Sequence, residues 1–344
     1  MRARSLLLLC LALPAARAHG APKDRGVCYA HAWHGDAGYG SETSARTVEH
    51  LRAVGVNALS LMPFGLMRNK SAPVIDSLSH HMGETDARMR AEIKAAHARG
   101  MRVALKPNIW ILGDAWPGAL TWQDDAAFGV WFESLRAMAL RYARFAAEED
   151  VDVYFFATEL KTATARDPAA FRRLIAELRA VYPRAGKHGR LAYAANWDEA
   201  DHVAFWDALD VVGVDVYTPL SDSAKPSDAE LALGAGRVVA SLGALAKRVQ
   251  RPIVIAELGY RAAEGAARAP SLWPEHDSAA YDPAIQARCY DAVLAALWTQ
   301  SWLEGIYIWK WFTDGKDEHG PIDYSPAGKP AEATLRGYFT RPPR

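Results

Sequence analysis

Short apolar runs alternate along the chain with segments in which apolar residues recur every three or four positions. The first pattern is typical of buried strands and the second of amphipathic helices. The predicted strands are 26–33, 56–64, 102–110, 151–159, 191–197, 210–217, 252–258 and 305–312. The predicted helices are 43–54, 85–99, 125–148, 168–181, 227–249, 283–297 and 330–339. Thr85 is the expected N-cap of the second helix.

Eight strands alternating with helices indicate a parallel sheet. Closing that sheet into a single (β/α)8 barrel, a TIM barrel, over residues 19–344 uses every unit and leaves no edge strand. An open, doubly wound sheet is the alternative fold, and it usually carries a glycine-rich phosphate turn after its first strand. Gly35, Gly38 and Gly40 follow the first strand without that spacing. We therefore interpret them as a loop over the barrel mouth.

The amino terminus predicts a secretory signal peptide over residues 1–18. Two arginines precede a short apolar run, and Ala16-Arg17-Ala18 is a small-residue cleavage site. No later segment reads as apolar enough for a membrane helix. We expect a secreted or periplasmic protein that does not insert into a membrane after cleavage. An oxidising compartment permits a disulfide between Cys28 and Cys289, and two buried free thiols are the alternative.

Bulk composition narrows the class of protein. The chain has 344 residues, of which 50% are hydrophobic, enough for one large barrel. Its 40 Lys and Arg residues balance 40 Asp and Glu residues. This neutrality argues against a nucleic-acid partner, which requires a basic surface. The composition gives no indication of oligomeric state.

Two glutamates, Glu159 and Glu257, each end an apolar strand. At the carboxyl end of a barrel strand a side chain points into the mouth, where barrel enzymes carry out their chemistry. Strand alternation predicts that Phe155 and Ala157 share a face with Glu159, and that Ile255 shares one with Glu257. Two carboxylates at this end of a barrel suggest cleavage of a glycosidic bond. A pair of structural, ion-paired glutamates is the alternative.

Polar and aromatic residues end nearly all the other strands. A sugar ring needs polar groups for its hydroxyls and an aromatic wall for its C–H face. The candidates are Trp33, Lys106, Asn108, Asn196, Tyr217, Trp309 and Trp311, with His31 and Asp215 beside them. The alternative interpretation of His31 is a hydrogen-bonded histidine of the core. The alternative interpretation of Asp215 is an ion pair with Lys106.

Long loops after the strands predict a substrate cleft. Trp116 and Trp273 lie in two of these loops and are either sugar platforms or anchors of their own loops. A metal-dependent hydrolase on this fold would need paired histidines on the first strand and more on the fifth and sixth. His31 and His34 are three residues apart, and neither later strand ends in histidine. We therefore expect no metal and no cofactor.

The chain resembles the retaining glycoside hydrolases of clan A and, among them, glycoside hydrolase family 113. The resemblance spans nearly all of the mature chain in order. The segments that carry it are Ala30-His31-Ala32-Trp33-His34-Gly35, Gly38-Tyr39-Gly40-Ser41, Leu61-Met62-Pro63-Phe64-Gly65, Lys106-Pro107-Asn108, Ala157-Thr158-Glu159-Leu160, Ala256-Glu257-Leu258-Gly259-Tyr260 and Tyr307-Ile308-Trp309-Lys310-Trp311.

The resemblance implies a role for each of the two glutamates. Glu159 matches the acid/base of the clan and Glu257 its nucleophile. Tyr217 is expected to hydrogen-bond Glu257. Many clan members have asparagine immediately before the acid/base, whereas this chain has Thr158.

The remaining candidates follow as expected sugar contacts. Trp309 or Trp311 is expected to form the floor of the reacting subsite. Lys106, Asn108 and Asn196 are expected to contact hydroxyls, and Trp33 and Tyr39 are expected to border the cleft.

The substrate class implied by the resemblance is β-1,4-mannan, and the predicted activity is that of an endo-β-1,4-mannanase. The chain leaves two alternatives open. One is another β-glycan hydrolase, such as a glucanase or an exo-mannosidase. The other is a catalytically weak, secreted carbohydrate-binding barrel, although such a protein would typically have lost a catalytic carboxylate.

Overall fold

The computed structural model describes residues 23–32, 36–77, 84–113, 115–274 and 278–341. Eight parallel strands close into a barrel in the order β1-β11-β10-β9-β8-β7-β5-β2. The (β/α)8 prediction is therefore confirmed. The barrel strands are β1 (Asp24–Ala30), β2 (Ala58–Leu61), β5 (Arg102–Leu105), β7 (Val153–Thr158), β8 (Arg190–Asn196), β9 (Val211–Val216), β10 (Ile253–Leu258) and β11 (Leu303–Phe312).

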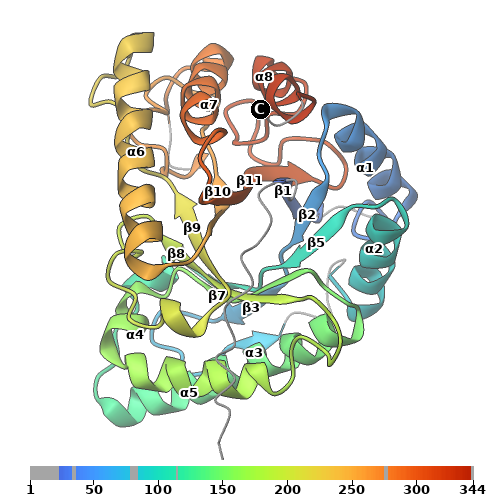
Figure 1. Cartoon of the computed structure of the whole chain (residues 1–344), viewed down its shortest axis with the longest axis vertical. Helices are drawn as coiled ribbons and strands as arrows, with labels where there is room; N and C mark the ends of the chain where they lie inside the picture. The colour runs from blue at the N-terminus through green and yellow to red at the C-terminus, as the bar shows by residue number, and fades with distance from the viewer. Residues whose placement is uncertain (1–22, 33–35, 78–83, 114, 275–277, 342–344) are drawn as a thin grey trace, which may run out of the picture.

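Helices surround this ring of strands on its outside (Figure 1). They are α1 (Glu42–Val54), α2 (Asp86–Ala98), α3 (Asp125–Glu148), α4 (Lys161–Arg166), α5 (Pro168–Arg179), α6 (Asp228–Val249), α7 (Pro283–Leu297) and α8 (Pro330–Phe339). Thr85 caps α2 as expected, because its hydroxyl accepts a hydrogen bond from the backbone of Arg88. The short helix α4 and the 3₁₀ turns Pro117–Ala119 and Trp206–Ala208 were not predicted.

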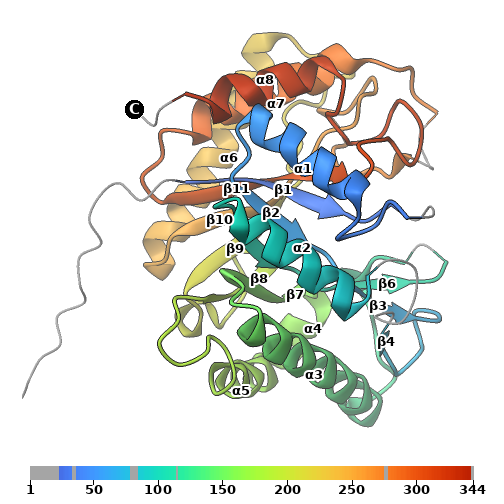
Figure 2. The same ribbon diagram turned by 90° about the vertical axis from the view of Figure 1, so that its right-hand side faces the viewer.

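Two predicted strands, 56–64 and 102–110, are each broken by a proline. Proline has no N–H to donate to a sheet, so Pro63 and Pro107 end the barrel pairing of β2 and β5. The chain continues from these breaks into β3 (Phe64–Met67) and β6 (Asn108–Ile111), which pair with each other in parallel. With β4 (Asp76–Ser77) they form a separate three-stranded sheet, the accessory sheet, at one side of the barrel (Figure 2).

The strand faces do not follow simple alternation. Val153 and Phe155 on β7 and Val254 and Ala256 on β10 belong to the small apolar cluster inside the barrel. Ala157, Ile253 and Ile255 belong instead to the core between barrel and helices. The prediction that Ile255 shares a face with Glu257, and Ala157 with Glu159, is therefore wrong.

Bulges explain this difference. Along β10 the register against β9 shifts between Ile255 and Glu257, and along β7 it shifts against β8 between Phe155 and Thr158. An extra residue in one strand reverses the side chains that follow it. Both glutamates are therefore re-aimed just before their strands end.

Helix α6 is the one described helix that is long and apolar enough to span a membrane by length and composition alone. The prediction that no such segment follows residues 1–18 is therefore wrong for α6. A capping box of Ser227 and Glu230 begins the helix, and Leu231, Val238 and Leu242 are buried in the core. Of its most apolar 18-residue window, 39% is buried inside the protein.

The two remaining cysteines are free and buried. Cys28 lies inside the barrel, whereas Cys289 lies on α7 in the core between barrel and helices. The alternative of two buried thiols is the one that the structure contains. The predicted signal peptide lies outside the described residues.

Candidate active site

Glu257, near the end of β10, is 6% exposed and is held by two groups. Its Oε1 forms an ion pair with the ammonium of Lys106, which follows β5. Its Oε2 accepts a hydrogen bond of 2.6 Å from the hydroxyl of Tyr217, which follows β9. This is the hydrogen bond that the sequence predicted. These two contacts fix the orientation of the Glu257 carboxyl group.

Glu159 follows β7 and has a backbone φ of 52°, in the left-handed region. Its N–H donates to the carbonyl of Ala194 on β8 at 2.7 Å, which fixes the turn. The amide of Asn196 donates to Oε1 at 2.9 Å, and the indole N–H of Trp116 donates to Oε2 at 2.6 Å. Both carboxyl oxygens therefore have a donor from the protein.

The pKa of Glu159 is raised to about 8. Desolvation is the main cause, and the negative charge of Glu257 adds to it. The hydrogen bond from Trp116 and the charge of Lys106 act in the opposite direction. Glu159 is therefore a neutral acid at neutral pH, with the anionic Glu257 close enough to influence it.

Three neighbouring strands bring the two glutamates together. Asn196 on β8 pairs in register with Asp215 on β9, and Asp215 pairs with Glu257 on β10. Asn196 also hydrogen-bonds Glu159, so the strand register places the residues around the two carboxyl groups on neighbouring strands. Glu159 directly follows β7 and Glu257 lies near the end of β10, so both are at the carboxyl end of the barrel.

A buried carboxyl group that sequence reasoning missed supports Glu159. Glu199 is 1% exposed and accepts hydrogen bonds of 2.7 Å from Thr164 and from Tyr193. The Tyr193 hydroxyl in turn accepts from the backbone N–H of Leu160, the residue after Glu159. Desolvation raises the pKa of Glu199 to about 7. The only sequence signal was a glutamate three residues beyond a strand-end asparagine, which is too common a pattern to single out.

The other candidate residues lie at different depths. Trp309 lies in the barrel interior and is 9% exposed. Asn108 begins β6 in the accessory sheet and donates to the carbonyl of Lys106 at 3.0 Å. Trp273 is 50% exposed on its loop, as a platform requires. Trp33 lies outside the described residues.

Several predicted roles do not fit the structure. Trp311 does not share a face with Trp309, because the register of β11 against β1 shifts between them. It lies in the outer core against His50. Tyr39 is 1% exposed and donates to the carbonyl of Tyr29, so it does not border the cleft.

Lys106 and Asp215 also differ from expectation. Lys106 has no exposed surface and forms its ion pair with Glu257, so the alternative of an ion pair with Asp215 does not fit the structure. A sugar hydroxyl contact by Lys106 does not fit its complete burial. The alternative interpretation of His31 does fit, since His31 is buried 2.9 Å from a carboxylate oxygen of Glu84.

Thr158 occupies the place of the asparagine found in many clan members. Its hydroxyl donates to the carbonyl of Pro107 at 3.4 Å. This bond joins the end of β7 to the proline that ends the barrel pairing of β5. Thr158 therefore fixes the position of a neighbouring strand end.

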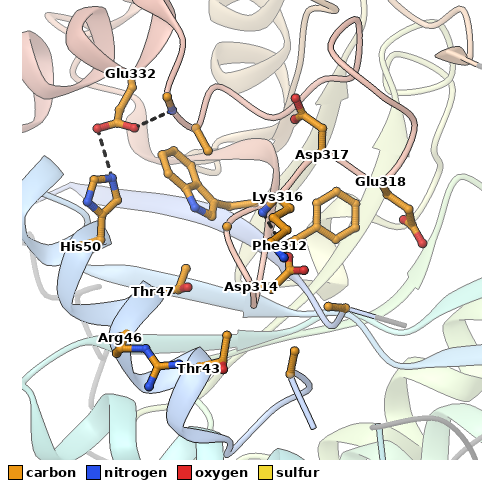
Figure 3. Close-up of a pocket in the computed structure, with 16 residues that line it drawn as sticks. Thr43, Arg46, Thr47, His50, Phe312, Asp314, Lys316, Asp317, Glu318 and Glu332 are labelled. Carbon is orange, nitrogen blue, oxygen red and sulfur yellow. Dashed lines mark hydrogen bonds and ion pairs between the residues drawn. The ribbon is translucent and has the colours of Figure 1, made fainter. Parts of the chain in front are cut away.

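A pocket of about 910 Å³ lies at the side of the barrel rather than between the two glutamates (Figure 3). Residues of α1, of the end of β11, of the following loop and of α8 line it, and Trp311 is one of them. His50 and Glu332 form an ion pair in its wall. Neither Glu159 nor Glu257 lines this pocket. The candidate active site is therefore defined by the two glutamates and their contacts, and this pocket is not part of it.

Across the described ranges, no group of three or more His, Cys, Asp or Glu side chains is arranged to hold a metal ion.

Comparison with known proteins gives one family. The sequence pattern of Glycoside Hydrolase Family 113 matches residues 29–329. No curated protein matches the chain significantly.

Several solved structures are similar. One is a complex of a family 113 β-1,4-mannanase, which has a TM-score of 0.80 and 22% identity and covers 93% of this chain and 100% of its own. Another is a family 113 β-mannanase from Alicyclobacillus acidocaldarius in complex with ManMIm, with a TM-score of 0.79 and 25% identity, covering 93% and 98%. A family 5 mannosidase from Rhizomucor miehei shares the fold, with a TM-score of 0.64 and 13% identity over 92% of each chain.

Proposed function

The chain belongs to glycoside hydrolase family 113, and from this membership we propose that it is a retaining endo-β-1,4-mannanase in which Glu257 is the nucleophile and Glu159 the acid/base. That it is a glycoside hydrolase of clan A follows from the family and the fold. We propose three further points: that the enzyme cleaves a β-1,4 linkage, that its substrate is mannan, and that the two glutamates have the roles just given.

The observation that carries the proposal is the contrast between the two carboxyl groups. Glu159 is a neutral acid, since its pKa is raised to about 8, whereas Glu257 is paired with Lys106 and Tyr217. When two carboxyl groups lie in environments as different as these, one can act as the acid and the other as the carboxylate. Retaining glycosidases need that combination.

The proposed reaction has two steps. In the first, Glu257 attacks the anomeric carbon, the bond to the leaving oxygen breaks, and Glu159 gives its proton to that oxygen. In the second, Glu159 takes a proton from water as the water oxygen attacks the anomeric carbon, and the ester bond to Glu257 breaks. The enzyme returns to its starting protonation state. Trp309, at the barrel end of β11, is the proposed floor of the reacting subsite.

Mannan is proposed as the substrate because two similar structures carry that activity in their names, a β-1,4-mannanase and a β-mannanase. The second is 25% identical to this chain over 93% of its length. Exposed aromatic rings at the loops, such as Trp273, are suited to the apolar faces of further sugar units.

The test is product analysis on a panel of β-1,4-linked polysaccharides: mannan, glucomannan, cellulose and xylan. We expect mannan to yield a ladder of oligosaccharides early in the reaction, since an endo enzyme cuts within the chain. Proton NMR of the first products should show the β anomer, because two displacements retain the configuration. The Glu257→Gln protein, prepared in parallel, controls for contaminating hydrolases.

Each part of the proposal has its own contradicting result. Cleavage of cellulose in preference to mannan would overturn the substrate. Release of single mannose units from the start would indicate exo action. An α anomer as first product would exclude the double displacement.

We further propose that the protein is exported, since residues 1–18 have the features of a secretory leader. Sequencing the amino terminus of the protein recovered from the culture medium or periplasm tests this. A mature chain that begins close to His19 is the expected result. A chain that keeps Met1 inside the cell would contradict it.

A further inference from the structure

Lys106 lies below the catalytic groups at the end of β5 and has no exposed surface. Its ammonium contacts Oε1 of Glu257 and lies 5.4 Å from the centre of the Trp309 ring. Burial alone would lower the pKa of Lys106, but the neighbouring carboxylate of Glu257 is the largest opposing influence, and the net effect is a raised pKa. Lys106 is therefore a permanent positive charge inside the barrel.

Asp215 is the second carboxyl group next to Lys106. It is 0% exposed on β9 and pairs in register with Glu257 on β10. Within the part of the chain that the structure describes, neither of its carboxyl oxygens has a hydrogen-bond partner. Burial raises the pKa of Asp215 well above its usual range, and the charge of Glu257 raises it further, against the effect of Lys106. A buried carboxylate without donors is costly, so the neutral acid is the stable form.

The ammonium of Lys106 is thus coupled electrostatically to two carboxyl groups, those of Glu257 and Asp215. It contacts only that of Glu257. The other titratable groups that influence this cluster do not supply a second positive charge. They are the thiol of Cys28 on β1, the phenols of Tyr217 and Tyr324, and the carboxyl groups of Glu159 and Glu199. Burial raises the pKa of the Cys28 thiol and of the Tyr217 phenol, which keeps both neutral.

We propose that Lys106 is a positioning residue, which keeps Glu257 ionised and aimed at the barrel mouth, and that Asp215 remains neutral beside it. The inference rests on the proposed role of Glu257 as nucleophile. Because Asp215 carries no charge, the whole charge of Lys106 compensates Glu257. Lys106 thereby acts through Glu257 and makes no contact with the sugar.

The kinetic test is Lys106→Met, which keeps the length of the side chain and removes its charge. An opposite charge at contact distance shifts a titration by about 1–3 pH units. We expect the acidic limb of the kcat/KM profile on an aryl β-mannoside to move toward neutral pH by one unit or more. The loss at pH 5 should be tenfold or greater and should shrink as the pH rises. A purely structural role would lower activity equally at every pH, and that result would overturn the proposal.

The control for this test is Lys329→Met. Lys329 is 8% exposed and forms an ion pair with Asp317 instead of with a glutamate of the proposed site. The expected result is an acidic limb in the wild-type position. A shift equal to that of Lys106→Met would show that any lost buried lysine has this effect and would overturn the proposal.

The second arm measures Asp215 directly and needs no turnover. Carboxyl ¹³C NMR of the wild-type chain labelled at aspartate is compared with that of Asp215→Asn, whose missing signal identifies Asp215. We expect that signal to have the shift of a protonated acid at pH 6, where most aspartates are ionised. An ionised Asp215 at pH 6 would overturn the proposal, even if Lys106→Met does not fold. A wild-type enzyme that cleaves no β-mannoside would contradict the proposed function and leave this measurement intact.

Discussion

The indole N–H of Trp116 donates to Oε2 of Glu159 across 2.6 Å. Trp116 lies in the loop after β6, is 37% exposed, and was expected to be a sugar platform or an anchor of its loop. Its contact with Glu159 gives it a third role, because a donor to a carboxylate favours the charged form. The loop therefore lowers the pKa of Glu159, the proposed acid/base.

Trp116→Phe should move the basic limb of the pH profile. The pKa of Glu159 is about 8, and the Trp116 hydrogen bond lowers it from a still higher value. Glu159 works as an acid only while protonated, so activity falls as the pH rises through this pKa. Removing the donor raises the pKa, and the basic limb of kcat/KM should move to higher pH. The measurement is kcat/KM on an aryl β-mannoside between pH 5 and pH 10.

Trp273→Phe is the matched control, since Trp273 is also an exposed loop tryptophan. Its basic limb should coincide with that of the wild type. If Trp116→Phe also leaves the limb in place, the hydrogen bond does not influence the acid.

The two glutamates should respond differently to substitution by glutamine. Glu159→Gln should lower cleavage of mannan by about 10²–10⁴-fold, because proton donation to the leaving oxygen is lost. It should still form the glycosyl-enzyme from a substrate whose leaving group needs no proton, such as a dinitrophenyl β-mannoside. Glu257→Gln should fail on both. A burst of dinitrophenol together with intact-protein mass spectrometry measures the intermediate, and identical behaviour of the two variants would show that the roles are wrongly assigned.

Glu199 should make stability depend on pH. The unfolded chain releases this proton near pH 4–5, whereas in the folded state the pKa of Glu199 is about 7 because of burial. The stability contributed by the neutral acid is therefore present below pH 4 and is lost as the pH rises through 7. Glutamine stays neutral throughout. The stability of Glu199→Gln relative to wild type should increase between pH 4 and pH 8 by on the order of 3 kcal/mol.

Urea denaturation of both proteins at pH 4, 6 and 8 measures this difference. A constant difference across the three pH values would mean that the pKa of Glu199 is the same in the folded and the unfolded chain.

Gly213 on β9 is required by close packing inside the barrel. A Cβ built there would lie 2.4 Å from the carbonyl oxygen of Tyr193 and 2.7 Å from the ring of Phe155. Gly213→Ala should therefore destabilise the fold by about 1–3 kcal/mol. Gly236 on α6 has no atom within 4 Å of the same position, so Gly236→Ala should be neutral or stabilising by up to about 1 kcal/mol. Thermal unfolding compares the two, and equal melting temperatures would contradict the packing argument.

The order of strands and helices could be predicted from the sequence because periodicity and length record which faces are buried. Helix α3 was predicted at the residues where it occurs, since its apolar positions repeat regularly over many turns. The accessory sheet was missed, although Pro63 and Pro107 were visible as breaks in two predicted strands. Both segments remain extended on either side of the proline, so composition alone does not separate them.

The site was predictable in its residue types and less so in its contacts. Glu159, Glu257 and Tyr217 were identified because strand ends face the mouth. Face assignments by alternation failed at the bulges. A bulge depends on the register against the neighbouring strand, so the sequence of the bulged strand alone does not reveal it. Trp311 is an example: its distance of two residues from Trp309 predicted a shared face, and an extra residue in β11 removes it. The pairing of Lys106 likewise depended on which carboxyl group the fold brings closer.

The breaks at Pro63 and Pro107 have a consequence for how the enzyme could be redesigned. Beyond them, β3 and β6 pair with each other and no longer with the barrel. Insertions or exchanges in that accessory sheet would change the surroundings of the proposed active site, while the bonds that orient Glu257 stay where they are. A library confined to residues 64–77 and 108–111 should therefore alter the preferred glycan length more readily than the rate of bond cleavage.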